Sequence, residues 1–234
     1  MSTPERQPRD KPPPLAELET GDISAMLAAG ERVRECQRVL ARTGATVVTE
    51  ALDGHKLVDD WSHYPPGDVF DHESGAQFYF HVHRDVSGEI GHFHTFLRTG
   101  SAGDGGSGAM HLVAISMSRL GQAQSLFTTN RWVTGESWLP ATEVIAALPG
   151  FGIDHAAPSW PLNIWITSML ALFRPEISWL LGQRDLAIDR LVGAGREPGA
   201  ALDDRTLEIC SELSISVDRR LNLLRAEMTR RNER

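Results

Sequence analysis

Four histidines of this chain stand in two His-x-His pairs, His81/His83 and His92/His94. Imidazole is the commonest nitrogen ligand for zinc, copper, iron and nickel. Two histidines two residues apart on a strand point to the same face of the sheet, so they can share one ion. The spacing therefore predicts a metal centre built from both pairs. The alternative is a polar sheet face whose histidines bond to water and to neighbouring side chains.

A β-hairpin over residues 76–98 would bring the two pairs together, because apolar and polar residues alternate in both of its arms. Ser87-Gly88 fits a two-residue turn, since glycine takes the positive φ that tight turns need. This turn pairs the two motifs across the ladder, His83 with His92 and His81 with His94. A slip of two residues keeps all four imidazoles on one face, whereas a slip of one separates the pairs.

An acidic and aromatic segment at residues 59–74 precedes the hairpin, and Pro65-Pro66-Gly67 predicts a rigid turn within it. Carboxylates beside a metal act as general bases, complete a ligand set or orient a ligating imidazole. The alternative is a surface loop whose aspartates cap turns. The predicted catalytic residues are Asp68, Asp71 and Tyr79. Further metal ligands are expected among His63, His72 and His111, the last because strand 109–118 would pair with 91–98 and set it near Phe96 or His94. Substrate contacts are expected from Trp61, Tyr64, Phe96 and Arg131.

The composition bounds the function. The chain has 234 residues, 41% of them hydrophobic, and a net charge of −8, which argues against nucleic-acid binding. Its two cysteines, Cys36 and Cys210, lie in helix-like patterns and are expected as buried thiols, and no Cys-x-x-Cys motif is present. The polar, proline-rich start lacks a signal peptide, and no apolar run is long enough to span a membrane. We expect a cytoplasmic protein without a membrane partner.

The pattern of the whole chain predicts an α+β fold, in which an antiparallel β-meander presents the histidine cluster and packs against N-terminal and C-terminal helices. Residues 1–13 are expected as a disordered leader and 14–234 as one domain. Within it we expect a helix over 14–44, loop and antiparallel sheet over 45–135, and mainly helices over 136–234. The sheet region includes a strand–turn–strand over 123–134, turning at Thr129-Asn130. The glycine-rich segment 99–109 is expected as a flexible connection; a lid is the alternative.

Prolines and capping residues in the helical region predict where its helices begin and end. Helices are expected from Pro140 to Leu148, from Pro161 to a break at Arg174-Pro175, beyond that break, and from Asp203 or Asp204 towards Arg231. The apolar pieces between 158 and 192 predict either a buried helical pair or the face of a homodimer.

The paired His-x-His strands resemble the metal-binding strands of cupins over about 20 residues. They lack a glutamate shortly after His83 and a separate late motif with one histidine, so the resemblance implies metal chemistry and not the cupin fold. The run HYPPGDVFDHESGAQFYFHVHR…GHFHTFLR is also similar to a family of uncharacterised bacterial proteins over about half the chain. That second resemblance implies no activity.

These observations favour a metal-dependent enzyme, namely a non-haem iron or copper oxidoreductase that acts on a small molecule with dioxygen. The expected cofactor is a transition metal ion, iron or copper before zinc. The alternatives are a zinc-dependent hydrolase, a metal or haem carrier without catalysis, and an interaction domain whose histidines form a dimer contact.

Overall fold

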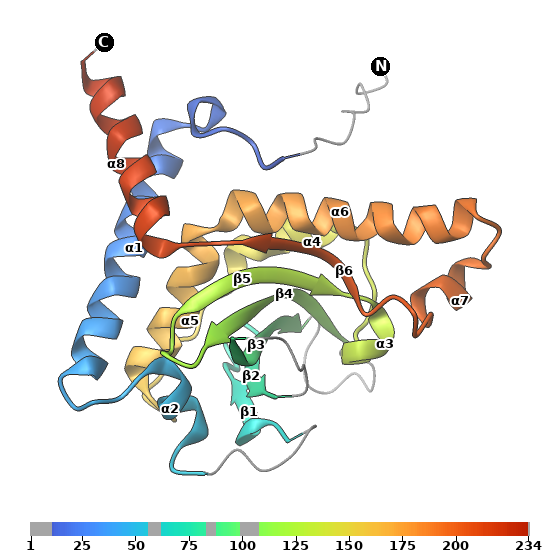
Figure 1. Cartoon of the computed structure of the whole chain (residues 1–234), viewed down its shortest axis with the longest axis horizontal. Helices are drawn as coiled ribbons and strands as arrows, with labels where there is room; N and C mark the ends of the chain where they lie inside the picture. The colour runs from blue at the N-terminus through green and yellow to red at the C-terminus, as the bar shows by residue number, and fades with distance from the viewer. Residues whose placement is uncertain (1–10, 56–61, 83–87, 99–107, 234) are drawn as a thin grey trace.

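The computed structural model describes residues 11–55, 62–82, 88–98 and 108–233 (Figure 1). The described chain begins with a 3-10 helix, Leu15–Glu17, and the helices α1 (Thr20–Ala41) and α2 (Val47–Leu52). Five strands follow in succession: β1 (Tyr64–Phe70), β2 (Ala76–His81), β3 (Glu89–Arg98), β4 (Ala109–Ser118) and β5 (Ala123–Thr129). The remaining elements are α3 (Arg131–Thr134), α4 (Ala141–Ala147), a 3-10 helix (Leu148–Gly150), α5 (Trp160–Leu172), α6 (Arg174–Gly193), α7 (Pro198–Leu202), β6 (Ile209–Ser214) and α8 (Val217–Asn232).

The strands form one antiparallel sheet in the order β1-β2-β3-β4-β5-β6. The sheet curves so that β4 and β5 arch over β2 and β3, and the helices gather on its convex side (Figure 1). This arrangement confirms the predicted α+β fold with an antiparallel meander and flanking terminal helices.

The apolar face of the sheet packs against α5. Phe78, Phe80 and Phe93 project from this face and are fully buried, and the rings of Phe93 and Trp165 of α5 lie with centroids 5.8 Å apart. Helix α1 packs on α5, and α6 lies along β5 and β6. Apolar residues that alternate along the strands therefore meet the apolar stripes of the helices, which is the usual solution for a half-polar sheet.

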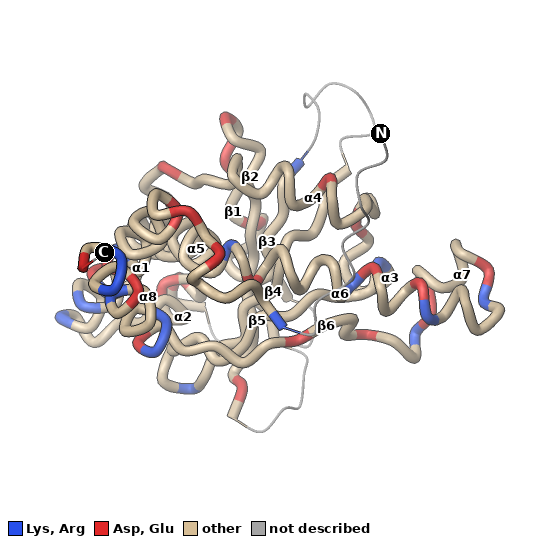
Figure 2. Tube along the Cα trace, turned by 90° about the horizontal axis from the view of Figure 1, so that it is seen from above, with Lys and Arg blue, Asp and Glu red and all other residues tan. Residues whose placement is uncertain are grey.

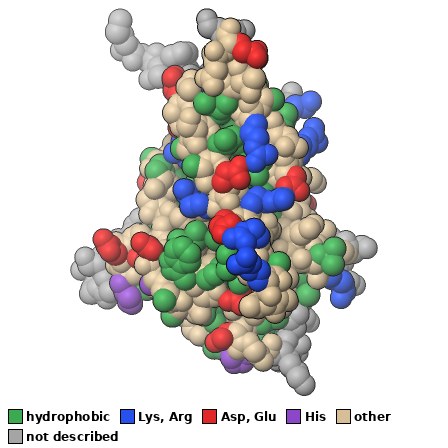
Figure 3. Space-filling model, turned by 90° about the vertical axis from the view of Figure 1, so that its left-hand side faces the viewer, with side chains coloured by type: hydrophobic (Ala, Val, Ile, Leu, Met, Phe, Trp, Pro, Cys, Tyr) green, Lys and Arg blue, Asp and Glu red, His purple; other side chains and the backbone are tan. Residues whose placement is uncertain are grey.

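The outer helices carry most of the charge. Lys, Arg, Asp and Glu are frequent on α1, α8 and α7 and sparse along β3 and β4 (Figure 2). On the side where α1 and α8 face the solvent, acidic and basic side chains intermingle (Figure 3), and the ion pairs Arg34–Asp218 and Arg225–Glu31 join the two helices. Such exposed pairs contribute little to stability, so the buried layers carry the fold.

The helices between Pro140 and Gly193 begin and end largely where they were predicted to. Pro140 precedes α4, α5 ends at Leu172 and α6 begins at Arg174 beside Pro175. Most apolar residues of α5 and α6 are buried in the core, so this region forms a buried helical pair; a homodimer through it stays a prediction. Among the described helices, none combines the length and the apolar character needed to cross a membrane.

Two predicted elements are wrong. The last helix does not begin at Asp203 or Asp204, because residues 209–214 form strand β6 and the side chain of Ser216 caps α8 by accepting from Arg219 N. The leucines and isoleucines there fit both a strand and a helix spacing, and pairing with β5 decides for the strand. Cys210 consequently lies in a strand; like Cys36 it forms no disulfide.

The second error concerns residues 123–134, where a single strand is followed by a short helix. Asn130 does not form a hairpin turn; its Oδ1 accepts from Arg131 N at 2.8 Å and caps α3.

The proline segment also differs from a plain turn. Pro65, Pro66 and Gly67 lie within β1, where the pairing with β2 is irregular, and prolines are tolerated there because β1 is an edge strand.

Most of the predicted leader (residues 1–10) and of the predicted glycine-rich connection (residues 99–107) lies outside the described residues.

Candidate metal centre

The register of the hairpin differs from the prediction by two residues. His81 pairs with His92, and Tyr79 pairs with His94. The connection between β2 and β3 is longer than a two-residue turn, so strand pairing and not the turn sets the register. Gly88 does have the expected positive φ, 89°, whereas Ser87 and His83 lie outside the described residues. A shift of two preserves parity, so the three described histidines still share a face.

Gly91 holds this register in place. Its φ is 153°, and a Cβ there would come within 2.5 Å of the Phe80 ring and 2.6 Å of the His81 carbonyl oxygen. Only glycine therefore lets β3 approach β2 this closely next to the histidines. The pairing with β4 shifts at the same point, between Glu89 and Gly91.

His81, His92 and His94 form a compact buried group. His92 and His94 are completely inaccessible to solvent and His81 is 4% exposed. One ligand atom from each of the three lies within 4.8 Å of the others, and the Nε2 atoms of His81 and His92 are 2.8 Å apart. Nitrogen ligands about 2.0 Å from a tetrahedral ion are about 3.3 Å from each other, so small adjustments would place one ion between these rings.

Two neighbours orient the imidazoles. The Glu89 carboxylate accepts from His92 Nδ1 at 2.7 Å, and its other oxygen accepts from Ser116 Oγ at 2.8 Å. His94 Nδ1 lies 3.0 Å from His111 Nε2. Because the Nδ1 atoms of His92 and His94 are held in this way, each ring offers Nε2 to an ion. A carboxylate behind a metal-binding histidine is the usual means of fixing its tautomer and raising its basicity.

His111 lies where it was expected, opposite Phe96 on β4 and bonded to His94. Burial lowers the pKa of its imidazole to about 3, with smaller contributions from Arg184 and His92. His111 is therefore neutral and can accept the proton that His94 Nδ1 offers. Its ring supports the group of three and is not part of it.

Aromatic rings wall the group. Tyr79 stacks on Phe96 with centroids 5.5 Å apart, and Phe127 meets the His92 ring edge-on at 5.1 Å. Burial raises the pKa of the Tyr79 phenol, and the charges of Asp68 and Glu136 add to the effect. Tyr79 lies in the site as predicted, and it keeps its proton at neutral pH.

His63 and Asp68 form a dyad at the rim of the site. The His63 ring stacks on Tyr79 at 3.6 Å, and its Nδ1 lies 2.9 Å from Asp68 Oδ1. Asp68 Oδ2 accepts from Gln77 Nε2 at 2.6 Å. The His63 side chain is 41% exposed, so the dyad connects the buried aromatic wall with the solvent.

Asp71 and His72 lie apart from the histidine group. Asp71 caps a turn, since its carboxylate accepts from the backbone N–H groups of Glu73, Ser74 and Asp154. These hydrogen bonds lower its pKa against the opposing effect of burial. His72 is exposed and meets the edge of the Phe70 ring.

The predicted substrate contacts are divided. Phe96 lines the site, whereas Tyr64, the first residue of β1, is buried in the core. Arg131 binds both carboxylate oxygens of Asp203 at the far end of β5. Trp61 lies outside the described residues.

Sequence reasoning missed Glu89 and Glu136, and each for a physical reason. Strict alternation assigns residues 89 and 92 to opposite faces, and only the irregularity at Gly91 turns Glu89 towards His92. Glu136 accepts from His111 N at 2.8 Å across 25 residues of sequence, a contact that no local spacing signals.

A comparison with protein-family models shows to which family the chain belongs. Residues 27–215 match a family model described as "Domain of unknown function (DUF6969)". The chain belongs to this family. The match covers α5, α6 and the whole sheet, including every histidine of the buried group. No curated protein and no solved structure matches the chain.

Proposed function

We propose that this DUF6969 protein is a metal-dependent oxidoreductase in which His81, His92 and His94 hold one iron or copper ion and which acts on a small molecule with dioxygen. The observation that carries the proposal is the buried group of three imidazoles, two of which are oriented through Nδ1 by Glu89 and His111. A carboxylate that bonds to Nδ1 is the usual means by which a metal-binding imidazole is oriented, and Glu89 stands in that position behind His92.

The three described histidines match the donor set of a catalytic ion. Structural zinc sites use four protein ligands, whereas catalytic sites use three and keep a position open. Within the described part of the chain, the group comprises three residues that could hold an ion. The three neutral imidazoles leave the charge of the ion uncompensated, and Glu89 returns one negative charge from behind His92. Imidazole suits iron, copper and zinc.

The surroundings favour dioxygen as co-substrate. The rings of Tyr79, Phe96 and Phe127 surround the histidines, and such an apolar environment suits an apolar molecule more than a charged one. A bound iron or copper ion would supply one-electron chemistry that imidazoles and carboxylates lack. The chain would contribute the rest: Glu89 fixes His92, the Tyr79 phenol offers a proton donor beside His81 and His94, and His63 with Asp68 accepts protons at the rim.

The test is metal analysis of protein purified without a histidine tag. We expect about one ion per chain in the wild type, or uptake of one on anaerobic reconstitution with Fe(II) or Cu(I). We expect loss of that ion in His94→Ala and in the more conservative His92→Gln. His72→Ala is the matched control, because His72 is exposed and outside the group. Circular dichroism of each variant checks that it is folded.

Activity then separates the proposal from its alternatives. Iron- or copper-loaded protein should consume oxygen with members of a small-molecule panel, and His94→Ala should not. Zinc alone at the site, with ester or amide hydrolysis and no oxygen uptake, would replace the oxidoreductase by a hydrolase. A wild type that neither retains nor takes up metal would refute the centre itself.

A further inference from the structure

A groove lies between helix α8 and the segment that precedes α1. Helix α8 lies beside the 3-10 helix Leu15–Glu17 (Figure 1). The volume of the groove is about 760 Å³, which is within the range of sites that bind small molecules. Its walls come from residues 11–16, from Phe173 and Glu176 at the junction of α5 and α6, from residues 213–216, and from α8. None of these residues belongs to the histidine group, so the groove is a separate site.

The wall formed by α8 follows from its sequence. Arg219, Leu223, Ala226 and Arg230 line the groove and follow one another at intervals of four, three and four residues. They therefore form one stripe, about 16 Å long, with a basic residue at each end. Leu223 is 49% exposed, and such an apolar side chain inside a concave lining indicates a surface for an apolar ligand. The other aliphatic residues of the lining are Pro12, Pro13, Pro14, Leu15, Ala16, Leu213 and Ile215.

The opposite wall is fixed in place by hydrogen bonds from α8. Arg231 donates to the carbonyl oxygens of Leu15 and Leu18 at 3.0 and 2.7 Å and to Thr20 Oγ1 at 2.8 Å. Three consecutive prolines, residues 12–14, also restrict the backbone of this wall. The groove is therefore formed before any ligand binds, so that binding orders little of the chain.

The charge of the lining favours an anion. Among the described residues that line the groove, four are basic and two are acidic, although the whole chain has a net charge of −8. Both acidic residues are already paired. Glu176 accepts from Arg220 at 2.7 and 3.0 Å, and Glu227 binds two arginines near the end of α8. Lys11 and Arg219 bond to no carboxylate within the described part of the chain, so the lining has two cations to offer an anionic ligand.

An aliphatic lining with an excess of positive charge matches an aliphatic acid. Arg219 is exposed, and arginine lays its methylene stem along apolar surface while its charged end stays at the water. Arg230, at the other end of the stripe, is occupied by Glu227. We propose that the groove binds an unbranched medium-chain fatty acid, with its alkyl chain against Leu223 and Ala226 and its carboxylate beside Arg219.

Calorimetric titration of the full chain tests this with octanoate, decanoate and dodecanoate as probes. We expect one saturable site, and we expect its affinity to rise about fourfold with each added CH₂ group, because the lining removes that group from water. Decanol has the same alkyl chain as decanoate without the charge. It should bind about fivefold more weakly, since it forms no ion pair at the exposed end of the groove.

Two variants separate the head of the ligand from its chain. Arg219→Glu should lower the affinity for decanoate about fivefold or more and leave that for decanol unchanged, because only the acid loses an attraction and meets a repulsion. Leu223→Gln should weaken the binding of both ligands alike. Arg119→Glu and Leu120→Gln are matched controls, since both residues are exposed in the turn between β4 and β5. Circular dichroism checks that each variant is folded.

Three results would overturn the proposal. Failure of all three acids to bind would refute the site itself. Equal binding of decanol and decanoate by the wild type would leave an uncharged aliphatic molecule as the occupant. An equal loss of both ligands in Arg219→Glu would show that Arg219 shapes the groove and does not pair with the carboxylate. Metal content should not change in either variant, so this proposal and the metal centre can fail independently.

Discussion

The two faces of the central strands are buried to the same degree and do different work. On β2, Phe78 and Phe80 face α5, whereas Tyr79 and His81 face the opposite way, and all four are 6% exposed or less. The apolar face needs only close packing. The histidine face also needs hydrogen-bond partners for its buried polar groups, and Glu89 and His111 supply two of them.

This difference teaches that burial alone does not separate the scaffold from the site. Both faces alternate with the strand period, so one set of residues 78, 80 and 93 and another of 79, 81, 92 and 94 come from the same stretch of chain. What distinguishes the second set is that its hydrogen bonds run among side chains. Substitutions on the apolar face should therefore change stability, and substitutions on the histidine face should change metal binding.

The largest effect is expected from Phe93→Ala on the apolar face. Removing a fully buried ring that packs on Trp165 and Phe78 leaves a cavity, and such truncations lower the free energy of unfolding by about 3–5 kcal/mol. Urea denaturation of the metal-free protein measures the loss. At urea concentrations below its unfolding transition, the variant should still bind one ion per chain.

A core variant that stays stable but loses the ion would show that the two faces are not separable. Leu120→Ala serves as the control, because this side chain is 77% exposed and its truncation should leave stability nearly unchanged.

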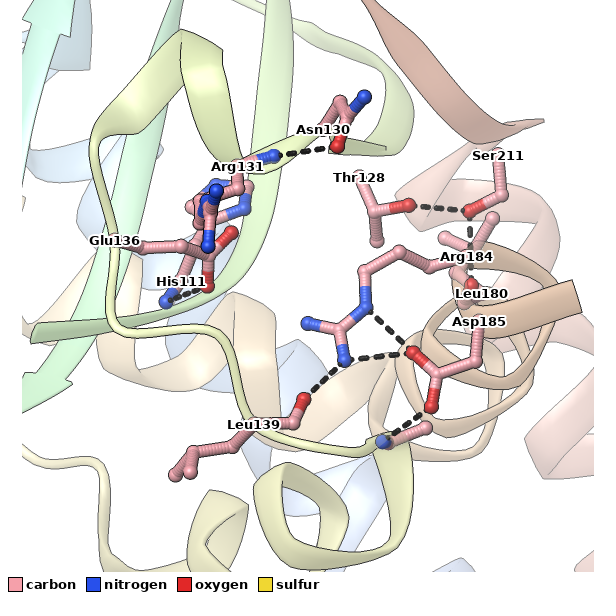
Figure 4. Close-up of polar contacts among 11 residues, drawn as sticks. His111, Thr128, Asn130, Arg131, Glu136, Leu139, Leu180, Arg184, Asp185 and Ser211 are labelled. Atoms are coloured by element: carbon pink, nitrogen blue, oxygen red, sulfur yellow. Dashed lines mark hydrogen bonds and ion pairs between the residues drawn. The ribbon is translucent and has the colours of Figure 1, made fainter. Parts of the chain in front are cut away.

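The second prediction concerns the pH dependence contributed by Glu136, whose carboxylate bonds to the backbone N–H of His111 (Figure 4). Burial raises the pKa of Glu136 to about 7, while Arg184 opposes the rise. The folded state thus favours the protonated carboxyl, and the stability gained below pH 4.5 is lost as the pH rises through about 7. A pKa raised from 4.5 to about 7 corresponds to about 3 kcal/mol.

The measurement is the free energy of unfolding of metal-free wild type and Glu136→Gln at pH 4.5 and 8. The wild type should lose up to about 3 kcal/mol more than the variant over this range. Phe93→Ala should follow the wild type in its pH dependence although its absolute stability is lower. If the free energy of unfolding changed equally with pH in wild type and Glu136→Gln, this would contradict the raised pKa of Glu136.

The third prediction is Glu89→Gln, which keeps the shape of the side chain and removes its charge. The amide can no longer hold His92 as a carboxylate does, so metal affinity should fall about 10–100-fold, the usual cost of losing a carboxylate behind a ligating histidine. Competition with a chelator measures it. Glu73→Gln is the control, because Glu73 is exposed in the turn before β2.

The two-residue spacing of the histidines was enough to predict that they share one face of the sheet. The alternation of apolar residues in the strands, together with the prolines at helix ends, was enough for the α+β fold and for the break at Arg174. The register and Glu89 were not predictable, because the long β2–β3 connection and the irregularity at Gly91 depend on contacts between strands. Strand β6 was not predictable from spacing, because its apolar residues satisfy both periods. Glu136 and Arg184 reach His111 only through the tertiary fold.

The smallest effect is expected from Arg131→Ala, outside both faces. A substrate contact was predicted for Arg131, but its guanidinium binds Asp203, and the two side chains are 32% and 58% exposed. Exposed pairs contribute about 0.2–1 kcal/mol, so stability, metal content and oxygen uptake should all stay close to those of the wild type. Loss of oxygen uptake with metal content unchanged would return Arg131 to the substrate site, and it would mean that the far end of β5 reaches the histidine face.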